Sequence, residues 1–170
     1  MEKLIQYLNE MVKLGLISGY ALGGATALIY YFEPFQTQDI DIFVLLKQKE
    51  NDLINLSPIY SFLSSKGVES NGEYVNIEGV PVQFLVPYNS LVEEAVHKAL
   101  SINFRSVEVP IPPLEYLMAI MVQTGRGKDK ARLEELSNHE DLYDKDELKK
   151  LLGKFNLDEK YEKILQWMKS

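Results

Sequence analysis

The sequence contains no cysteine, and it has fewer basic than acidic residues. The absence of cysteine excludes a disulfide framework and any thiolate metal site. With 18 Lys and Arg against 25 Asp and Glu, the formal net charge is −7. Extended binding to DNA or RNA needs a clustered basic surface, so a dedicated nucleic-acid-binding domain is not expected. Binding of a single nucleotide stays open, because a metal ion and a few local donors are enough for it.

Long apolar runs are also missing. No stretch approaches the roughly 18 consecutive apolar residues that a transmembrane helix requires. The first segment, 1–14, interleaves charged and apolar residues and does not have the pattern of a secretion signal. We therefore expect a soluble, cytoplasmic protein without a membrane partner.

Apolar periodicity predicts an α+β protein in which the strands come first. Strand-like stretches, two of them joined by a Glu78-Gly79 hairpin turn, occur at 17–22, 39–46, 74–77, 80–86 and 102–111. Helical patterns occur at 1–14, 25–32 and 91–100 and then, beyond residue 112, at 113–122, 128–136, 144–152 and 158–168. The expected fold is a mixed β-sheet flanked by helices over 1–111, with a C-terminal helical region, 112–170, packed with it as one unit.

Two aspartates on one predicted strand are the most informative residues. Side chains alternate along a strand, so Asp39 and Asp41 point the same way, with Cα atoms about 7 Å apart. Two carboxylates on one face repel each other unless a cation lies between them. A divalent ion such as Mg²⁺ suits this position because it prefers carboxylate oxygens and leaves room for phosphate oxygens. The alternative is a pair of solvated carboxylates at a strand edge.

A glycine pair precedes these aspartates in the chain. Gly23 and Gly24 follow an apolar stretch and lead into a helical one. Glycines at such a turn allow the backbone to approach a ligand closely, and their amides suit an anionic phosphate. Taken alone, the pair could equally be a structural turn. With Asp39 and Asp41 downstream, it favours a site that holds a triphosphate between backbone amides and a metal ion.

The stretches LGGATAL and TQDIDIFV together resemble the signature of the DNA polymerase β-like nucleotidyltransferase superfamily. The more specific resemblance is to its small prokaryotic branch, which includes abortive-infection-type toxins. Thr37 matches the Thr or Ser that this branch carries two residues before the first aspartate. The stretch GRGKDKARLEEL matches its helix with Arg126, Lys128 and Asp129, although a Lys-Asp pair at a helix start is also a common capping arrangement.

The resemblance implies a transferase that moves a nucleotidyl group from a nucleoside triphosphate, such as ATP, to a hydroxyl of an unknown acceptor. That acceptor could be a protein, the end of a tRNA or a small molecule, and a cognate antitoxin-like protein is an expected partner. Asp39 and Asp41 would be catalytic and would bind Mg²⁺ or Mn²⁺. The nucleotide-binding residues would be Gly23, Gly24, Thr37, Gln83, Arg126, Lys128 and Asp129.

Two positions depart from the pattern of active relatives. Gln83 lies on the strand where relatives place a third carboxylate, and glutamine cannot accept a proton as a base. Met121 occupies the place of a lysine that contacts the triphosphate in toxin relatives. These departures leave a second hypothesis open, in which a degenerate nucleotidyltransferase-fold protein binds nucleotide or a partner protein without turnover.

Overall fold

The computed structural model describes residues 1–32, 37–47, 54–104 and 107–168. The chain forms two compact units, Met1–Pro112 and Pro113–Ser170. They correspond to the sheet-containing and helical regions expected at 1–111 and 112–170. That the two pack as one unit stays a prediction.

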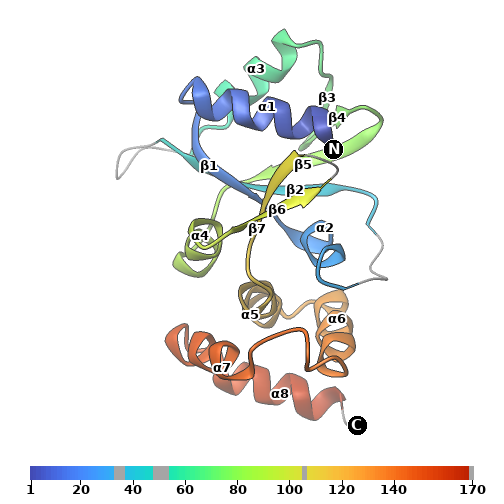
Figure 1. Cartoon of the computed structure of the whole chain (residues 1–170), viewed down its shortest axis with the longest axis vertical. Helices are drawn as coiled ribbons and strands as arrows, with labels where there is room; N and C mark the ends of the chain where they lie inside the picture. Colours follow the sequence, from blue (N-terminus) through green and yellow to red (C-terminus); the bar gives the residue numbers. More distant parts are fainter. Residues whose placement is uncertain (33–36, 48–53, 105–106, 169–170) are drawn as a thin grey trace. The chain divides into compact units, whose positions relative to one another are not determined.

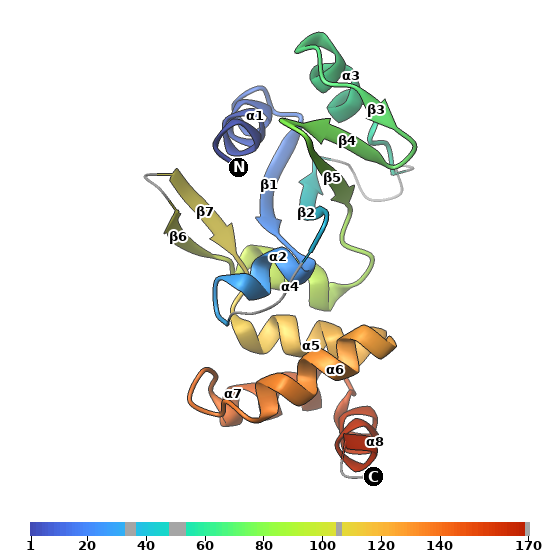
Figure 2. The same ribbon diagram turned by 90° about the vertical axis from the view of Figure 1, so that its right-hand side faces the viewer.

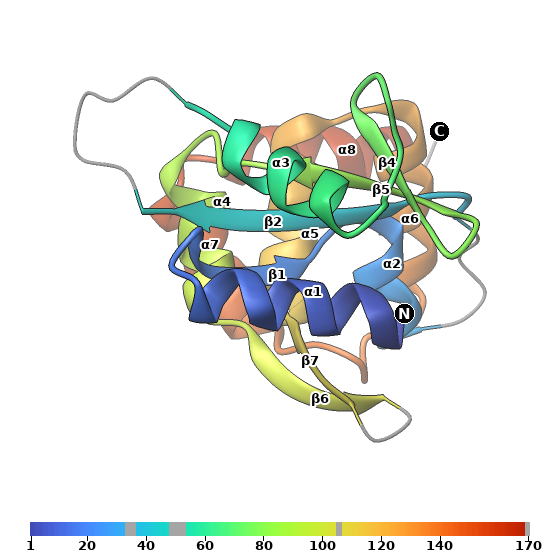
Figure 3. The ribbon, with the colours of Figure 1, turned by 90° about the horizontal axis from the view of Figure 1, so that it is seen from above.

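A five-stranded mixed sheet forms the centre of the first unit (Figures 1 and 3). Its strands, in spatial order, are β1 (Ile17–Leu22), β2 (Ile40–Leu46), β5 (Val80–Leu85), β4 (Tyr74–Ile77) and β3 (Ser70–Asn71). The β2–β5 pair is parallel, and the other neighbours are antiparallel. The prediction of a mixed sheet is therefore confirmed, and so is the hairpin turn at Glu78-Gly79, where both residues have positive φ.

Helices cover both faces of this sheet. One face packs against α1 (Glu2–Lys13), where Tyr20 Oη donates to Asn9 Oδ1 at 2.9 Å, and against α3 (Ser57–Ser65), where the Tyr60 and Phe84 rings meet edge to face. On the opposite face, α4 (Ser90–His97) packs against β1 and β2. The Asn89 side chain caps α4 as its sequence indicates, accepting from Val92 N at 3.0 Å.

Three sequence expectations for the strands need correction. The single strand expected over 102–111 is instead two antiparallel strands, β6 (Leu100–Phe104) and β7 (Val107–Ile111), which form a separate two-stranded sheet near β1 (Figure 2). Alternation continues through both strands, so the period alone could not reveal the reversal. The short strand β3 was not expected, because two residues carry no period. Strand β2 begins at Ile40, one residue later than expected, so Asp39 lies in the preceding bend.

The second unit is helical, as predicted. It consists of α5 (Leu114–Thr124), α6 (Gly127–Ser137), α7 (Lys145–Lys154) and α8 (Asp158–Met168). Helix α5 contacts the other three helices of this unit, and most of its residues are buried. Among the described residues, no helix is both long and apolar enough to cross a membrane.

Candidate functional site

The two aspartates lie at the start of β2. Asp39 and Asp41 are both half-buried, and Ile40 between them is buried in the core. Thr37 Oγ1 lies 2.8 Å from Asp39 Oδ1 and 2.9 Å from Asp39 O, so its hydroxyl can donate to either oxygen. The structure thus brings Thr37 together with Asp39, and this contact orients the carboxylate in the bend before the strand.

The glycine turn lies directly against Asp41. Gly23 N donates to Asp41 O at 2.8 Å, and helix α2 (Gly24–Ile29) begins at the next residue. Gly24 has φ +53°, and a Cβ placed there would lie 2.1 Å from Asp41 Oδ2. A Cβ at Gly23 would lie 2.6 Å from the Phe43 ring. Only glycine allows both close approaches, so the turn backbone and the Asp41 carboxylate share one small space.

A row of side chains continues from Asp41 across the open part of the same sheet face. In register, Asp41 on β2 lies opposite Gln83 on β5, Gln83 lies opposite Tyr74 on β4, and Tyr74 lies opposite Asn71 on β3. The predicted placement of Gln83 beside Asp41 is therefore confirmed. Gln83 Nε2 donates to Glu73 Oε2 at 2.9 Å, so the glutamine holds a carboxylate that comes from the β3–β4 turn.

Tyr74 connects this carboxylate to the two aspartates. Partial desolvation raises the pKa of the Tyr74 phenol, and the negative charges of Asp39, Asp41 and Glu73 and a hydrogen bond with Asp39 raise it further. The phenol therefore stays neutral at physiological pH. Tyr74 is exposed, and the negative charges of three carboxylates gather around it.

Asp39 and Asp41 are the residues that would hold a divalent metal ion, because such an ion prefers carboxylate oxygens. Among the described residues, no group of three or more His, Cys, Asp and Glu side chains lies close enough to hold a metal. Asp39 and Asp41 would thus be the only acidic ligands from the described chain, and the other positions would be left to water and phosphate oxygens, as Mg²⁺ prefers. The position that a Cβ at Gly24 would take is filled by the Asp41 carboxylate itself, so only glycine there lets this carboxylate keep its place at the turn.

Sequence reasoning missed Glu73 and Tyr74. A usable signal was present in the Asn71-Gly72 dipeptide, which is a strong hairpin marker. This dipeptide predicts a hairpin in which a further strand pairs with 74–77 and Glu73 lies in the turn between them. The chain therefore carries a carboxylate beside Gln83, supplied by a turn rather than by the strand itself.

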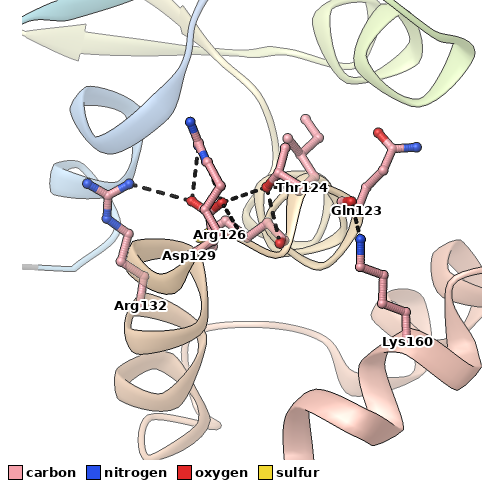
Figure 4. Close-up of polar contacts among 8 residues, drawn as sticks. Gln123, Thr124, Arg126, Asp129, Arg132 and Lys160 are labelled. Carbon is pink, nitrogen blue, oxygen red and sulfur yellow. Dashed lines mark hydrogen bonds and ion pairs between the residues drawn. The ribbon is translucent and has the colours of Figure 1, made fainter.

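The candidate residues in the second unit lie at the junction of α5 and α6 (Figure 4). Asp129 has an exposed fraction of 0% and accepts from Thr124 Oγ1 at 2.6 Å and from Arg126 Nε at 2.7 Å and N at 3.2 Å. It thus serves as a cap for the start of α6. Lys128 is exposed on the first turn, whereas Met121 is buried with an exposed fraction of 6%. That Arg126, Lys128 and Asp129 bind nucleotide stays a prediction.

The Asp129 network predicts a pH-dependent contribution to stability. Burial alone would raise the pKa of Asp129, but hydrogen bonds from Arg126 and Thr124 and the charge of Arg126 outweigh it, so the net shift is downward from 3.8. The contribution is therefore present above about pH 4 and is lost as the pH falls through the lower, folded-state pKa.

Asp129→Asn should cost about 1.5–3 kcal/mol of unfolding free energy at pH 7, because it removes the ionised acceptor of the hydrogen bonds from Thr124 and Arg126. Thermal unfolding from pH 7 down to pH 2 should show this difference shrinking below pH 4. Asp141→Asn, at an exposed position of the same unit, should change stability by less than about 0.5 kcal/mol. A difference that does not depend on pH would contradict an electrostatic origin.

Comparison with solved structures shows which fold this arrangement belongs to. The chain is similar to an antigenic nucleotidyltransferase-like protein from Paracoccidioides brasiliensis, at 14% sequence identity and a TM-score of 0.55, over 97% of this chain and 89% of that one. A candidate nucleotidyltransferase from Thermotoga maritima also matches, at 14% identity and a TM-score of 0.47, over 81% of this chain and 92% of that one. No family model and no curated protein matches the sequence.

At this level of identity, the first likeness concerns the fold and not the activity. The mixed sheet flanked by helices, which the sequence predicts, agrees with it. This chain therefore has the nucleotidyltransferase fold.

Proposed function

We propose that this protein is a metal-dependent nucleotidyltransferase, which moves a nucleotidyl group from a nucleoside triphosphate to a hydroxyl of an acceptor. The observation that carries the proposal is the close approach of the Gly24 backbone to the Asp41 carboxylate, with Asp39 beside it. A triphosphate is positioned by carboxylates that hold a metal ion and by backbone that its phosphates can approach closely. A divalent ion held by Asp39 and Asp41 would neutralise phosphate charge.

The residues around Asp41 lie on two sides of it, as an in-line displacement requires. The glycine turn follows β1, on one side of β2, and would bind the phosphates. Glu73 lies over β5 and β4, on the other side of β2. An acceptor hydroxyl on that side would attack the α-phosphorus while the bond to pyrophosphate breaks. Its proton would pass to the Glu73 carboxylate, which Gln83 orients.

The second candidate is a protein that binds nucleotide, or a partner such as an antitoxin-like protein, without turnover. Gln83 favours this alternative, because an amide cannot act as the base. Glu73 weighs against it, since a carboxylate lies within hydrogen-bond distance of that amide. The two candidates differ in turnover and share nucleotide binding.

Both candidates predict that ATP and Mg²⁺ stabilise the protein together. Ligand at about 100 times its dissociation constant adds roughly 2.7 kcal/mol, which for this chain length corresponds to a rise in melting temperature of about 5–10 °C. Neither ATP nor Mg²⁺ alone should give the same rise. Asp41→Asn should remove the joint response and leave the protein folded, whereas Asp141→Asn should keep it. A flat response to all four triphosphates with saturating Mg²⁺ or Mn²⁺ would contradict nucleotide binding.

A further inference from the structure

A hollow of about 210 Å³ lies on the hairpin side of the sheet. It is lined by Asn71, Tyr74, Val75, Asn76 and Pro81. Asn71 lies opposite Tyr74 in register, and Asn76 lies opposite Pro81, so these four side chains belong to the face that carries Gln83 and Asp41. Tyr74, which contacts Asp39, therefore forms part of the wall of the hollow.

The position of the hollow in the sheet places it on the Glu73 side of Asp41. Strand order runs from β1 through β2, β5 and β4 to β3, and the hollow lies over the last three strands. The glycine turn lies at the opposite side, after β1. Attacking and leaving oxygens occupy opposite sides of the phosphorus, so with the phosphates at the glycine turn, as the proposed function has them, an acceptor would approach from the side of this hollow.

The lining suits one flat ring. Tyr74 and Pro81 present ring surfaces on which a planar group can stack, and the surface that lines the hollow is almost wholly apolar. The volume is below the roughly 300–1,000 Å³ of sites that enclose a whole drug-sized ligand. The hollow can therefore seat one ring-sized part of a larger molecule.

The acidic residues around the hollow favour an uncharged or cationic acceptor over a polynucleotide. The segment 67–85 contains Glu69, Glu73 and Glu78 but no Lys, Arg or His. The preceding Lys66 pairs with Glu10 at 2.7 Å. A polynucleotide end would bring phosphates to this surface without basic partners, which is unfavourable. An uncharged or cationic molecule meets no such repulsion.

We propose that this hollow binds the acceptor of the nucleotidyl group; this inference rests on the proposed function. The hollow binds the ring of a small, uncharged or cationic hydroxyl compound, and it presents that hydroxyl to Glu73. The acceptor is then a small molecule rather than the end of an RNA.

Two matched phenols test the subsite. Tyramine carries an ammonium group, and 3-(4-hydroxyphenyl)propionate carries a carboxylate on an otherwise similar molecule. Titration of isotope-labelled protein, followed by backbone amide shifts, should place tyramine at Asn71, Tyr74 and Asn76. Tyramine should bind at least about tenfold more tightly than the propionate, with the difference shrinking at high salt.

Asn71→Trp should fill the hollow and weaken tyramine binding at least tenfold, because Asn71 is exposed on the edge strand and tolerates a large side chain. Asn138→Trp, at an exposed helix end of the other unit, should leave it unchanged. Both variants should keep the melting response to ATP and Mg²⁺. Tyramine shifts elsewhere, no tyramine binding, or tighter binding of the propionate or of a short oligoribonucleotide would overturn the subsite, and a normal ATP response in the same samples would leave the proposed function standing.

Discussion

Glu73→Gln should lower the rate of nucleotidyl transfer by about 10²–10⁴-fold, the range associated with a positioned general base. The change keeps the size of the side chain and removes its negative charge and its capacity to accept a proton. The melting response to ATP and Mg²⁺ should persist, since Asp39, Asp41 and the glycine turn are untouched. Glu69→Gln changes an exposed glutamate just before β3 and should leave the rate unchanged.

A double variant separates a base from a structural role for Glu73. Glu73→Gln with Gln83→Glu exchanges the two groups, so an amide–carboxylate pair can form again with the carboxylate on β5. We expect this variant to recover part of the lost rate. In the wild-type background, Gln83→Glu alone would place two carboxylates together, which is unfavourable. Full activity of Glu73→Gln would show that the base is another group or the substrate itself.

Gly24→Ala should abolish both the ATP–Mg²⁺ melting response and transfer, with a loss of rate of at least about 10²-fold. The added Cβ would lie 2.1 Å from Asp41 Oδ2, so the carboxylate must leave its position. The substitution also places alanine at φ +53°, which costs about 1 kcal/mol or more of stability.

Gly67→Ala is the matched control for this substitution. Gly67 has φ +77°, but a Cβ there meets nothing within 4 Å. It should therefore show the backbone cost without the displaced carboxylate, and it should keep the response to ATP and Mg²⁺. If Gly24→Ala retains that response, the ligand does not depend on the position of the Asp41 carboxylate and the site lies elsewhere.

The features of the fold that depend on a local sequence pattern could be predicted from the sequence. Alternation placed Gln83 on the face of Asp41, the Glu78-Gly79 turn predicted the β4–β5 hairpin, and helical spacing predicted all four C-terminal helices. Each of these follows from a repeat of two or about 3.6 residues, or from a turn residue with positive φ. Such signals lie within a short stretch of chain.

The parts that could not be predicted depend on pairing between distant segments. Glu73 has no pattern of its own and reaches the site only because the β3–β4 hairpin pairs beside β5. The reversal within 100–111 was hidden for the opposite reason, because both strands share one alternation. Asp129 was weighed as either a nucleotide-binding residue or a cap, and its buried hydrogen bonds show the cap directly.

Transfer of the α-phosphate label from a nucleoside triphosphate tests the central claim most directly. Each of the four triphosphates, labelled at either the α- or the γ-position, would be incubated with the protein, Mg²⁺ or Mn²⁺, and tyramine or a small-molecule extract. We predict that the α-label of at least one triphosphate moves to a new product while an equal amount of pyrophosphate is released, and that Asp41→Asn and Glu73→Gln suppress both. Retention of both labels on all four triphosphates, despite a clear melting response, would contradict the enzyme and favour binding without turnover.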